Sequence, residues 1–253
     1  MGIWMLNKIE LDDIEKIALD AGNAIMKIYN RDFSVEYKED LSPLTEADIV
    51  SHNIIVEGLK KYVIPIMSEE GKKIVYEERS NWEYYWCIDP IDGTKEFIKK
   101  NGEFTVNIAL IYRDTPVLGI VYAPVPRDMY IAKKGDGAFK NGVALPLKQH
   151  LNLHEKMWVV ASKSHLSEET QEFIDGLDTK EIVQVSKGSS LKLCMVAEGE
   201  ADIYPRLAPT MEWDTAAADA IVRESGKMTY QFENKQPLLY NKRDLLNPWF
   251  VVK

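Results

Sequence analysis

The sequence predicts an α+β fold that is followed by a smaller α/β unit. In the first 150 residues, two stretches with helical spacing of apolar residues precede a series of β-rich runs separated by turn residues. Beyond residue 151, short β-rich runs alternate with helical patterns. We therefore expect N-terminal helices packed on a mostly antiparallel sheet in residues 1–150 and an α/β unit in residues 151–253. The boundary is soft, and the two parts are expected to form a single compact unit.

Composition places the chain among globular proteins and limits its partners. The 253 residues are 45% hydrophobic and 10% aromatic, which is enough for a packed core. A net charge of −9 argues against nucleic acid polymers and anionic membranes, but not against a small anionic substrate, because bound divalent cations would reverse the local field. Cys87 and Cys194 lack C-x-x-C spacing, which favours a reducing compartment.

No apolar run approaches the roughly 18 residues of a membrane span, and the apolar N-terminus lacks the basic flank of a signal peptide. We therefore expect a cytoplasmic protein with no integral membrane segment. Peripheral association with the inner face of the membrane stays open.

Two helices are expected near the start of the chain. Apolar residues repeat at spacings of three and four over residues 7–29, which predicts a long amphipathic helix. Val35–Lys38 follows as a short strand. A second helix is expected to begin near Thr45 and to run to about Leu59. Asp48 falls at the third position of this helix, where a capping-box acid is the simpler interpretation.

Two apolar runs are then expected to end in acidic residues. Val63–Met67 predicts a strand that ends at Glu69 and Glu70, although acids are also ordinary in solvated turns. Tyr84–Ile88 predicts a buried strand, which should stop at Asp89-Pro90 because proline has no N–H to donate to a sheet.

The residues after that second strand can bind ions of both signs. The carboxylates of Asp89 and Asp92, with the carbonyl of Ile91 between them, are the oxygen ligands that Mg²⁺ or Ca²⁺ take. Gly93 permits a tight turn, and the amides of Gly93 and Thr94 would face an anion at the start of a short helix over residues 95–100. An Asx turn followed by a helix N-cap is the alternative interpretation.

The remaining elements follow the same patterns. Strands at 104–112, 117–122 and 129–133 predict an antiparallel meander, and Asn141-Gly142 marks a further hairpin. In the second half, strands are expected at 157–161, 181–185, 202–204, 228–230 and 249–252, and helices at 168–176, 189–198 and 214–225.

Two helix starts in the second half are candidate binding elements. The small-residue turn Lys187–Lys192 opens a helix and could hold an anion with a cation nearby. Asp214 lies at the start of the next helix. Each also has the simpler interpretation of a helix cap.

Together these stretches resemble the inositol monophosphatase superfamily. The resemblance is carried by 68–70 (Ser-Glu-Glu), 89–94 (Asp-Pro-Ile-Asp-Gly-Thr) and 213–217 (Trp-Asp-Thr-Ala-Ala), and it covers essentially the whole chain. It implies a layered αβαβα fold and a Mg²⁺-dependent, lithium-sensitive phosphomonoesterase. Ala218 departs from the pattern, since many members have glycine there, but that position affects helix packing rather than metal binding.

Within the superfamily the chain is similar to bacterial 3′(2′),5′-bisphosphate nucleotidases of the CysQ type. The similar stretches are 92–98, 101–109, 162–165, 188–192 and 204–206, and Glu96 stands where inositol phosphatases usually carry asparagine. The resemblance implies hydrolysis of the 3′-phosphate of adenosine 3′,5′-bisphosphate (PAP) to AMP, extending to its sulfated form PAPS, with a role in sulfur metabolism. An inositol or sugar phosphate substrate and a non-catalytic nucleotide sensor are the alternatives.

The resemblance also implies roles for individual residues. It gives one Mg²⁺ to Glu69, Asp89 and the Ile91 carbonyl, a second to Asp89, Asp92 and Asp214, and a third, weaker ion to Glu69 through water. It makes Asp48 and Thr94, with Glu69, the catalytic group, with the first two orienting and deprotonating the attacking water. It assigns substrate contacts to Gly93, Thr94, His165, Ser189, Lys192, Arg206 and Asp214. A structural or surface role is the alternative for His165 and Arg206. The expected partner is a nucleotide bisphosphate, and the protein is expected to be a monomer or homodimer.

Overall fold

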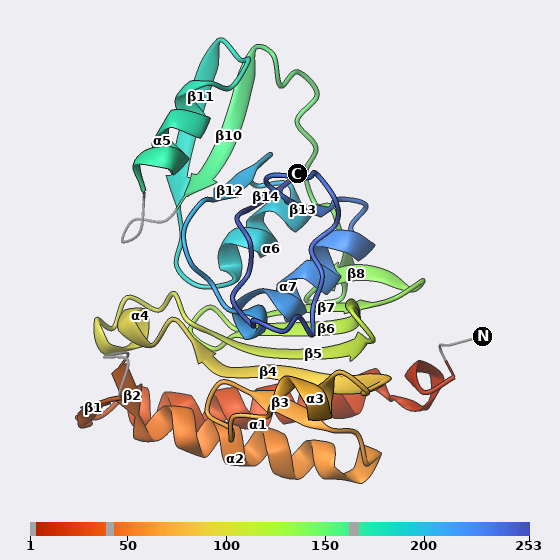
Figure 1. Cartoon of the computed structure of the whole chain (residues 1–253). Helices are drawn as coiled ribbons and strands as arrows, with labels where there is room; N and C mark the ends of the chain where they lie inside the picture. Colours follow the sequence, from red (N-terminus) through yellow and green to blue (C-terminus); the bar gives the residue numbers. More distant parts are fainter. Residues whose placement is uncertain (1–3, 39–42, 162–166) are drawn as a thin grey trace.

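A computed structural model describes residues 4–38, 43–161 and 167–253. Figure 1 shows the layers in order: a layer of long helices, the central sheet, a second layer of helices, a smaller set of strands, and an outer helix. The layered αβαβα fold predicted from the resemblance is therefore confirmed. In the part of the chain that the structure describes, no helix is both long and apolar enough to cross a bilayer.

The first layer consists of α1 (Leu11–Tyr29) and α2 (Glu46–Leu59). The apolar stripe of α1 is buried as its spacing predicts, but the helix begins at Leu11 rather than near residue 7. Residues 6–8 form a separate 3-10 turn, η1 (Leu6–Lys8), and Ile9 after it is extended. A hairpin of β1 (Val35–Tyr37) and β2 (Pro43–Thr45) leads into α2, and η2 (Lys60–Tyr62) follows it.

The central sheet has seven strands in the order β3-β4-β5-β6-β7-β8-β9. Its strands are β3 (Ile66–Ser68), β4 (Tyr84–Asp92), β5 (Thr105–Tyr112), β6 (Thr115–Ala123), β7 (Asp128–Lys133), β8 (Gly137–Lys140) and β9 (Val143–Ala144). Within this sheet, β3 and β4 are the one parallel pair and the other described pairs are antiparallel, so the predicted antiparallel meander is confirmed. Two short helices, α3 (Tyr76–Arg79) and α4 (Thr94–Ile98), flank β4 in sequence.

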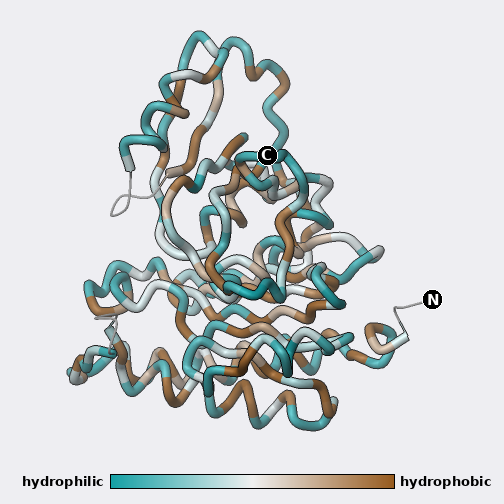
Figure 2. The backbone as a smooth tube through the Cα atoms, viewed as in Figure 1, coloured by the Kyte–Doolittle hydropathy of each residue, from teal (hydrophilic) through white to brown (hydrophobic). Residues whose placement is uncertain are grey.

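Helices cover both faces of the sheet, and successive side chains of a strand point to opposite faces, so neighbouring residues of one strand are buried in different clusters. Trp86 and Ile88 of β4 belong to the apolar cluster with α1 and α2, whereas Tyr85 and Cys87 belong to the cluster on the opposite face. Figure 2 shows apolar stretches along the strands of the sheet and on the helices beside it. This two-sided burial explains why β4 reads as a continuous apolar run.

The opposite face is covered by α6 (Leu191–Glu198) and α7 (Glu212–Glu224). Beyond them lie the antiparallel strands β12 (Tyr204–Arg206), β14 (Phe250–Val252) and β13 (Thr229–Gln231), in that order. The parallel pair β10 (Lys156–Ala161) and β11 (Glu181–Ser186) carries the outer helix α5 (Glu168–Asp175). The proposed division at residue 150 stays a prediction.

Three predicted strands have clearly wrong limits, and one of them, expected over 202–204, is β12 at Tyr204–Arg206. The strand expected over 63–67 begins only at Ile66, because Val63 adopts a left-handed conformation with φ 54°. β4 does not stop at Asp89 but continues through Pro90 to Asp92, with a register shift between Asp89 and Asp92. Proline is tolerated at such an irregularity because no ladder hydrogen bond is required of it there.

Candidate active site

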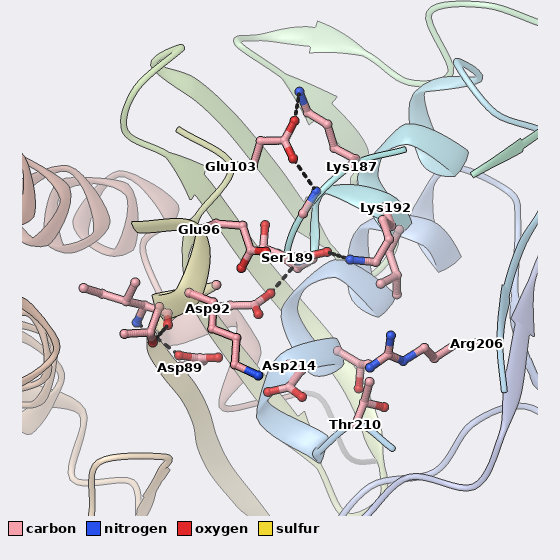
Figure 3. Close-up of a pocket in the computed structure, with 18 of the residues that line it drawn as sticks. Asp89, Asp92, Glu96, Glu103, Lys187, Ser189, Lys192, Arg206, Thr210 and Asp214 are labelled. Carbon is pink, nitrogen blue, oxygen red and sulfur yellow. Dashed lines mark hydrogen bonds and ion pairs between the residues drawn. The ribbon is translucent and has the colours of Figure 1, made fainter. Parts of the chain in front are cut away.

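A cavity of about 490 Å³ opens where the end of β4 meets the starts of α6 and α7 (Figure 3). Its lining brings together most of the residues assigned from sequence: Glu69, Asp89, Ile91, Asp92, Gly93, Thr94, Ser189, Lys192, Arg206 and Asp214. Asp48 contacts Thr94 from behind this lining. His165 lies outside the described residues.

Three carboxylates from three elements converge on one point of this cavity. Glu69, Asp89 and Asp214 each offer an oxygen, and these oxygens lie within 4.8 Å of one another. The parallel pairing of β3 with β4 sets Ser68 opposite Ile88, and the Glu69 amide donates to the Ile88 carbonyl at 3.2 Å. Asp214 arrives from the first turn of α7, where its Oδ2 accepts the Met211 amide at 2.8 Å.

The cluster lacks enough positive charge to balance it. Burial, together with Glu69, Asp92 and Asp214, raises the pKa of Asp89 well above its usual range. Burial and then the charge of Asp92 raise the pKa of Asp214 to about 8. Asp89 is only 1% exposed, and within the described residues its Oδ2 has no hydrogen-bond partner. Crowded oxygen ligands with an unpartnered buried oxygen fit a hard divalent cation.

One cation of the chain already contacts this cluster. Lys38 Nζ donates to Glu69 Oε1 at 2.9 Å and to Glu70 Oε1 at 2.5 Å. Burial acts to lower the pKa of Lys38, but the two carboxylates outweigh it and raise the pKa. No local pattern in the sequence predicts a role for Lys38, because its partner Glu69 lies 31 positions further along the chain.

Asp48 and Thr94 form a pair beside the acidic cluster. Thr94 Oγ1 donates to Asp48 Oδ1 at 3.2 Å and lies 3.3 Å from the Ile91 carbonyl oxygen. The other oxygen of Asp48 accepts from the Thr45 amide at 2.8 Å and from Thr45 Oγ1 at 2.6 Å. Asp48 is therefore both a capping-box acid and a partner of Thr94, so the two interpretations of this residue are compatible. Burial raises its pKa, which makes the carboxylate a stronger base.

The opposite wall of the cavity is cationic. Burial lowers the pKa of Lys192 to about 8, although Asp92 opposes that shift, and Lys192 Nζ donates to the Ser189 carbonyl at 2.7 Å. Arg206 Nη2 donates to the Pro209 carbonyl at 2.7 Å. Arg206 Nε and Ser189 Oγ are buried without partners among the described residues. Unpaired donors beside a buried ammonium fit an anionic, hydrogen-bonding ligand.

This cavity is also lined by several residues to which the sequence patterns assigned no individual role, although some of them lie in the stretches that carry the resemblance. Its lining also includes Lys95, Glu96, Lys99, Glu103, Lys187, Tyr204 and Thr210. Glu103 Oε2 accepts the Gly188 amide at 2.9 Å, and Glu103 Oε1 lies 3.5 Å from Lys187 Nζ, a pair that Figure 3 shows at the rim. A Cβ on Gly188 would lie 2.7 Å from the Glu103 carbonyl oxygen, so only glycine fits this approach. In the sequence, Gly188 signals a close backbone approach in this turn, but nothing local identifies Glu103 as the residue that it approaches.

The sequence matches a known protein family along nearly its whole length. The model of the inositol monophosphatase family matches residues 8–249. The chain is 44% identical over 246 residues to the 3′(2′),5′-bisphosphate nucleotidase CysQ of Salmonella typhimurium strain LT2, covering 96% of this chain and 98% of that one. It is 43% identical over 247 residues to the protein of the same name from Escherichia coli strain K12, with the same coverage.

Solved structures agree with the family match. The crystal structure of CysQ from Bacteroides thetaiotaomicron, a bacterial member of the inositol monophosphatase family, superposes with a TM-score of 0.87 at 44% identity over 95% of both chains. The extragenic suppressor protein SuhB from Bartonella henselae shares the fold with a TM-score of 0.77 at 23% identity, over 96% of this chain and 92% of that one. By its sequence match along nearly its whole length and by its fold, this chain belongs to the inositol monophosphatase family.

Proposed function

We propose that this protein is a Mg²⁺-dependent 3′(2′),5′-bisphosphate nucleotidase that hydrolyses the 3′-phosphate of PAP to AMP and phosphate. The observation that carries the proposal is identity of 44% to proteins of that name over 96% of this chain. The cavity supports it because a cluster of acids faces a cationic wall in one space of about 490 Å³. PAPS, which shares the 3′-phosphate, is the second substrate that we expect.

The acidic cluster would hold the cations. Glu69, Asp89 and the Ile91 carbonyl would bind one Mg²⁺, and Asp89, Asp92 and Asp214 a second, so Asp89 would bridge them. A third ion would reach Glu69 through water. When bound, Mg²⁺ supplies Lewis acidity that lowers the pKa of the attacking water and offsets charge on the leaving oxygen. Li⁺ is expected to inhibit the enzyme.

The protein's own groups would orient the water and the substrate. The Asp48–Thr94 pair, joined at 3.2 Å, would hold the water and accept its proton. The amides of Gly93 and Thr94 would hold the transferred phosphate, since Gly93 has a φ of 95° at the start of α4. Ser189, Lys192 and Arg206 would contact the nucleotide, as would His165 by resemblance.

The test is phosphate release from PAP and from inositol 1-phosphate under identical conditions. We expect turnover of PAP that requires Mg²⁺, falls with added Li⁺, and yields 5′-AMP by chromatography. Asp89→Asn is the control, and it should abolish turnover without unfolding the protein. Preference for inositol 1-phosphate would keep the cation site and reject the nucleotide contacts. Binding of PAP with no turnover of either compound would favour a sensor.

A further inference from the structure

A buried polar network lies behind the cavity and contacts Asp92. The Ser190 amide donates to Asp92 Oδ2 at 2.5 Å, and the Asn107 side-chain amide lies 3.5 Å from the same oxygen. Ser190 Oγ donates to Asn107 Oδ1 at 3.0 Å and lies 2.8 Å from Thr105 Oγ1. Thr105, Asn107 and Ser190 are all at most 1% exposed. Such a network is costly to bury unless each member is satisfied, and here each one is.

This network fixes one oxygen of Asp92 and leaves the other available. Both contacts reach Oδ2, and among the described residues no hydrogen bond or ion pair reaches Oδ1. A carboxylate held in this way presents a single oxygen in a fixed direction. Groups that hold a ligand from behind typically set its orientation and affect metal affinity.

The same network joins two elements that carry different parts of the site. Thr105 and Asn107 lie on β5 beside the end of β4, whereas Ser190 precedes α6 and adjoins Ser189. Glu103 holds the same turn through the Gly188 amide. The position of Asp92 and that of the turn at 187–192 are therefore set together, as the facing positions of Asp92 and Ser189 in Figure 3 illustrate.

We propose that Asn107 and Ser190 are positioning residues, which orient the Asp92 carboxylate for a divalent cation and tie it to the turn that carries Ser189 and Lys192. The link to the nucleotide-facing turn rests on the proposed function, but the effect on cation binding does not. Thr105 offers a matched control: it pairs with Asp92 across the two strands, but its hydroxyl bonds to Ser190 Oγ and, among the described residues, makes no hydrogen bond to the Asp92 carboxylate.

The test measures Mg²⁺ affinity of the full chain by calorimetry after removal of metal, without substrate. Asn107→Leu keeps side-chain size and removes the Asn107 hydrogen bonds to Asp92 and to Ser190 Oγ, while the Ser190 amide still reaches Asp92. We expect its Kd for Mg²⁺ to rise about tenfold. Thr105→Val should leave the Kd within about twofold while lowering thermal stability to a similar extent. In turnover of PAP by Asn107→Leu, the Mg²⁺ concentration for half-maximal rate should rise, and added Mg²⁺ should restore most of kcat.

Two outcomes would overturn the proposal: an unchanged Kd in a folded Asn107→Leu, or an equal loss of affinity in Thr105→Val, which would make the network structural only. If Asn107→Leu does not fold, the Mg²⁺ affinity of Ser190→Ala tests the proposal instead. This variant keeps the amide that contacts Asp92 and removes the link to Asn107, so the Kd should rise about threefold, and no change would reject the proposal. If the wild-type protein does not hydrolyse PAP but this affinity pattern holds, only the proposed function fails.

Discussion

At the residue scale, Asp89 shows how function and stability oppose each other at this site. Its carboxylate is buried, is repelled by four other acids (Glu69, Asp92, Asp214 and Asp48) and has an oxygen without a hydrogen-bond partner in the described part of the chain. A buried charge of this kind destabilises a metal-free protein. Under the proposed function, the same features suit Asp89 to bridge two cations, because bound positive charge would relieve the repulsion between Asp89 and the neighbouring carboxylates.

Asp89→Asn should therefore raise metal-free stability and remove the response to Mg²⁺. Replacing the acid by a neutral amide relieves the repulsion, and we expect a gain of about 1–3 kcal/mol in the free energy of unfolding. In the wild-type protein, Mg²⁺ at about 100 times its Kd should add about 2.7 kcal/mol. Urea unfolding with EDTA and with Mg²⁺ measures both effects. A variant that is still stabilised by Mg²⁺ to the wild-type extent would contradict the prediction.

Lys192→Met should likewise stabilise the metal-free protein while weakening nucleotide binding. Burial lowers the pKa of Lys192 to about 8, against about 10.4 in an unfolded chain, so the folded state opposes protonation. Below pH 8 the lysine is charged in both states and the full cost applies, about 3 kcal/mol at most. Between pH 8 and 10.4 the unfolded state binds more protons, so this cost disappears as pH rises.

The stability gain of Lys192→Met should thus be largest at pH 7 and much smaller near pH 9.5. Urea unfolding of both proteins at the two pH values, with EDTA present, measures it. Lys16→Met is the control, since Lys16 is exposed and only pairs with Asp20 on the surface of α1. An equal gain at both pH values would show that packing, rather than the charge, causes it.

At the element scale, the packing of α7 on β6 depends on one glycine. A Cβ at Gly119 would lie 2.2 Å from the Ala217 carbonyl oxygen and 2.7 Å from Ala220 Cβ. Helix and strand therefore approach so closely that no side chain fits between them. Since α7 also carries Asp214, this contact sets how far that carboxylate lies from Asp89.

Gly119→Ala should destabilise the protein by about 3 kcal/mol, because the clash is with backbone and can be relieved only by moving α7. It should also weaken Mg²⁺ binding by displacing Asp214. Urea unfolding and Mg²⁺ calorimetry give the two values. Gly176→Ala is the control: its nearest neighbour would be 3.3 Å away and its φ of −86° is ordinary, so little change is expected. Wild-type stability of Gly119→Ala would disprove this account of the packing.

Sequence patterns predicted most of these helices and strands. They failed where contacts between residues far apart in the chain determine the limit of a strand or the partner of a side chain. The continuous apolar run of β4 and the apolar stripe of α1 depend on local spacing, and both are recovered. The passage of β4 through Pro90 depends on the irregular pairing with β5, which local rules do not contain. The candidate metal ligands were found by motif, but Ser190 is 98 positions from Asp92, so no local signal relates the two.

At the scale of the whole molecule, the two halves of the chain share one of the apolar clusters that make up the core. The cluster between the sheet and α7 contains Tyr85 and Val121 from the first half and Ala217 and Ile221 from the second. The candidate cation cluster also draws Glu69 and Asp89 from one half and Asp214 from the other. This cluster and the candidate cation cluster therefore each need residues from both halves, whereas the cluster beneath α1 and α2 is formed by the first half alone.

Unfolding should therefore be a single cooperative event. The six tryptophans are spread over both halves, so fluorescence reports on the whole chain. We expect urea transitions followed by fluorescence and by far-UV circular dichroism to coincide. A fragment of residues 1–150 should fail to fold, because removing α6 and α7 exposes one entire apolar face of the sheet. Two separate transitions, or a folded fragment with a sharp thermal melt, would show instead that residues 1–150 form an independent domain to which the second half docks.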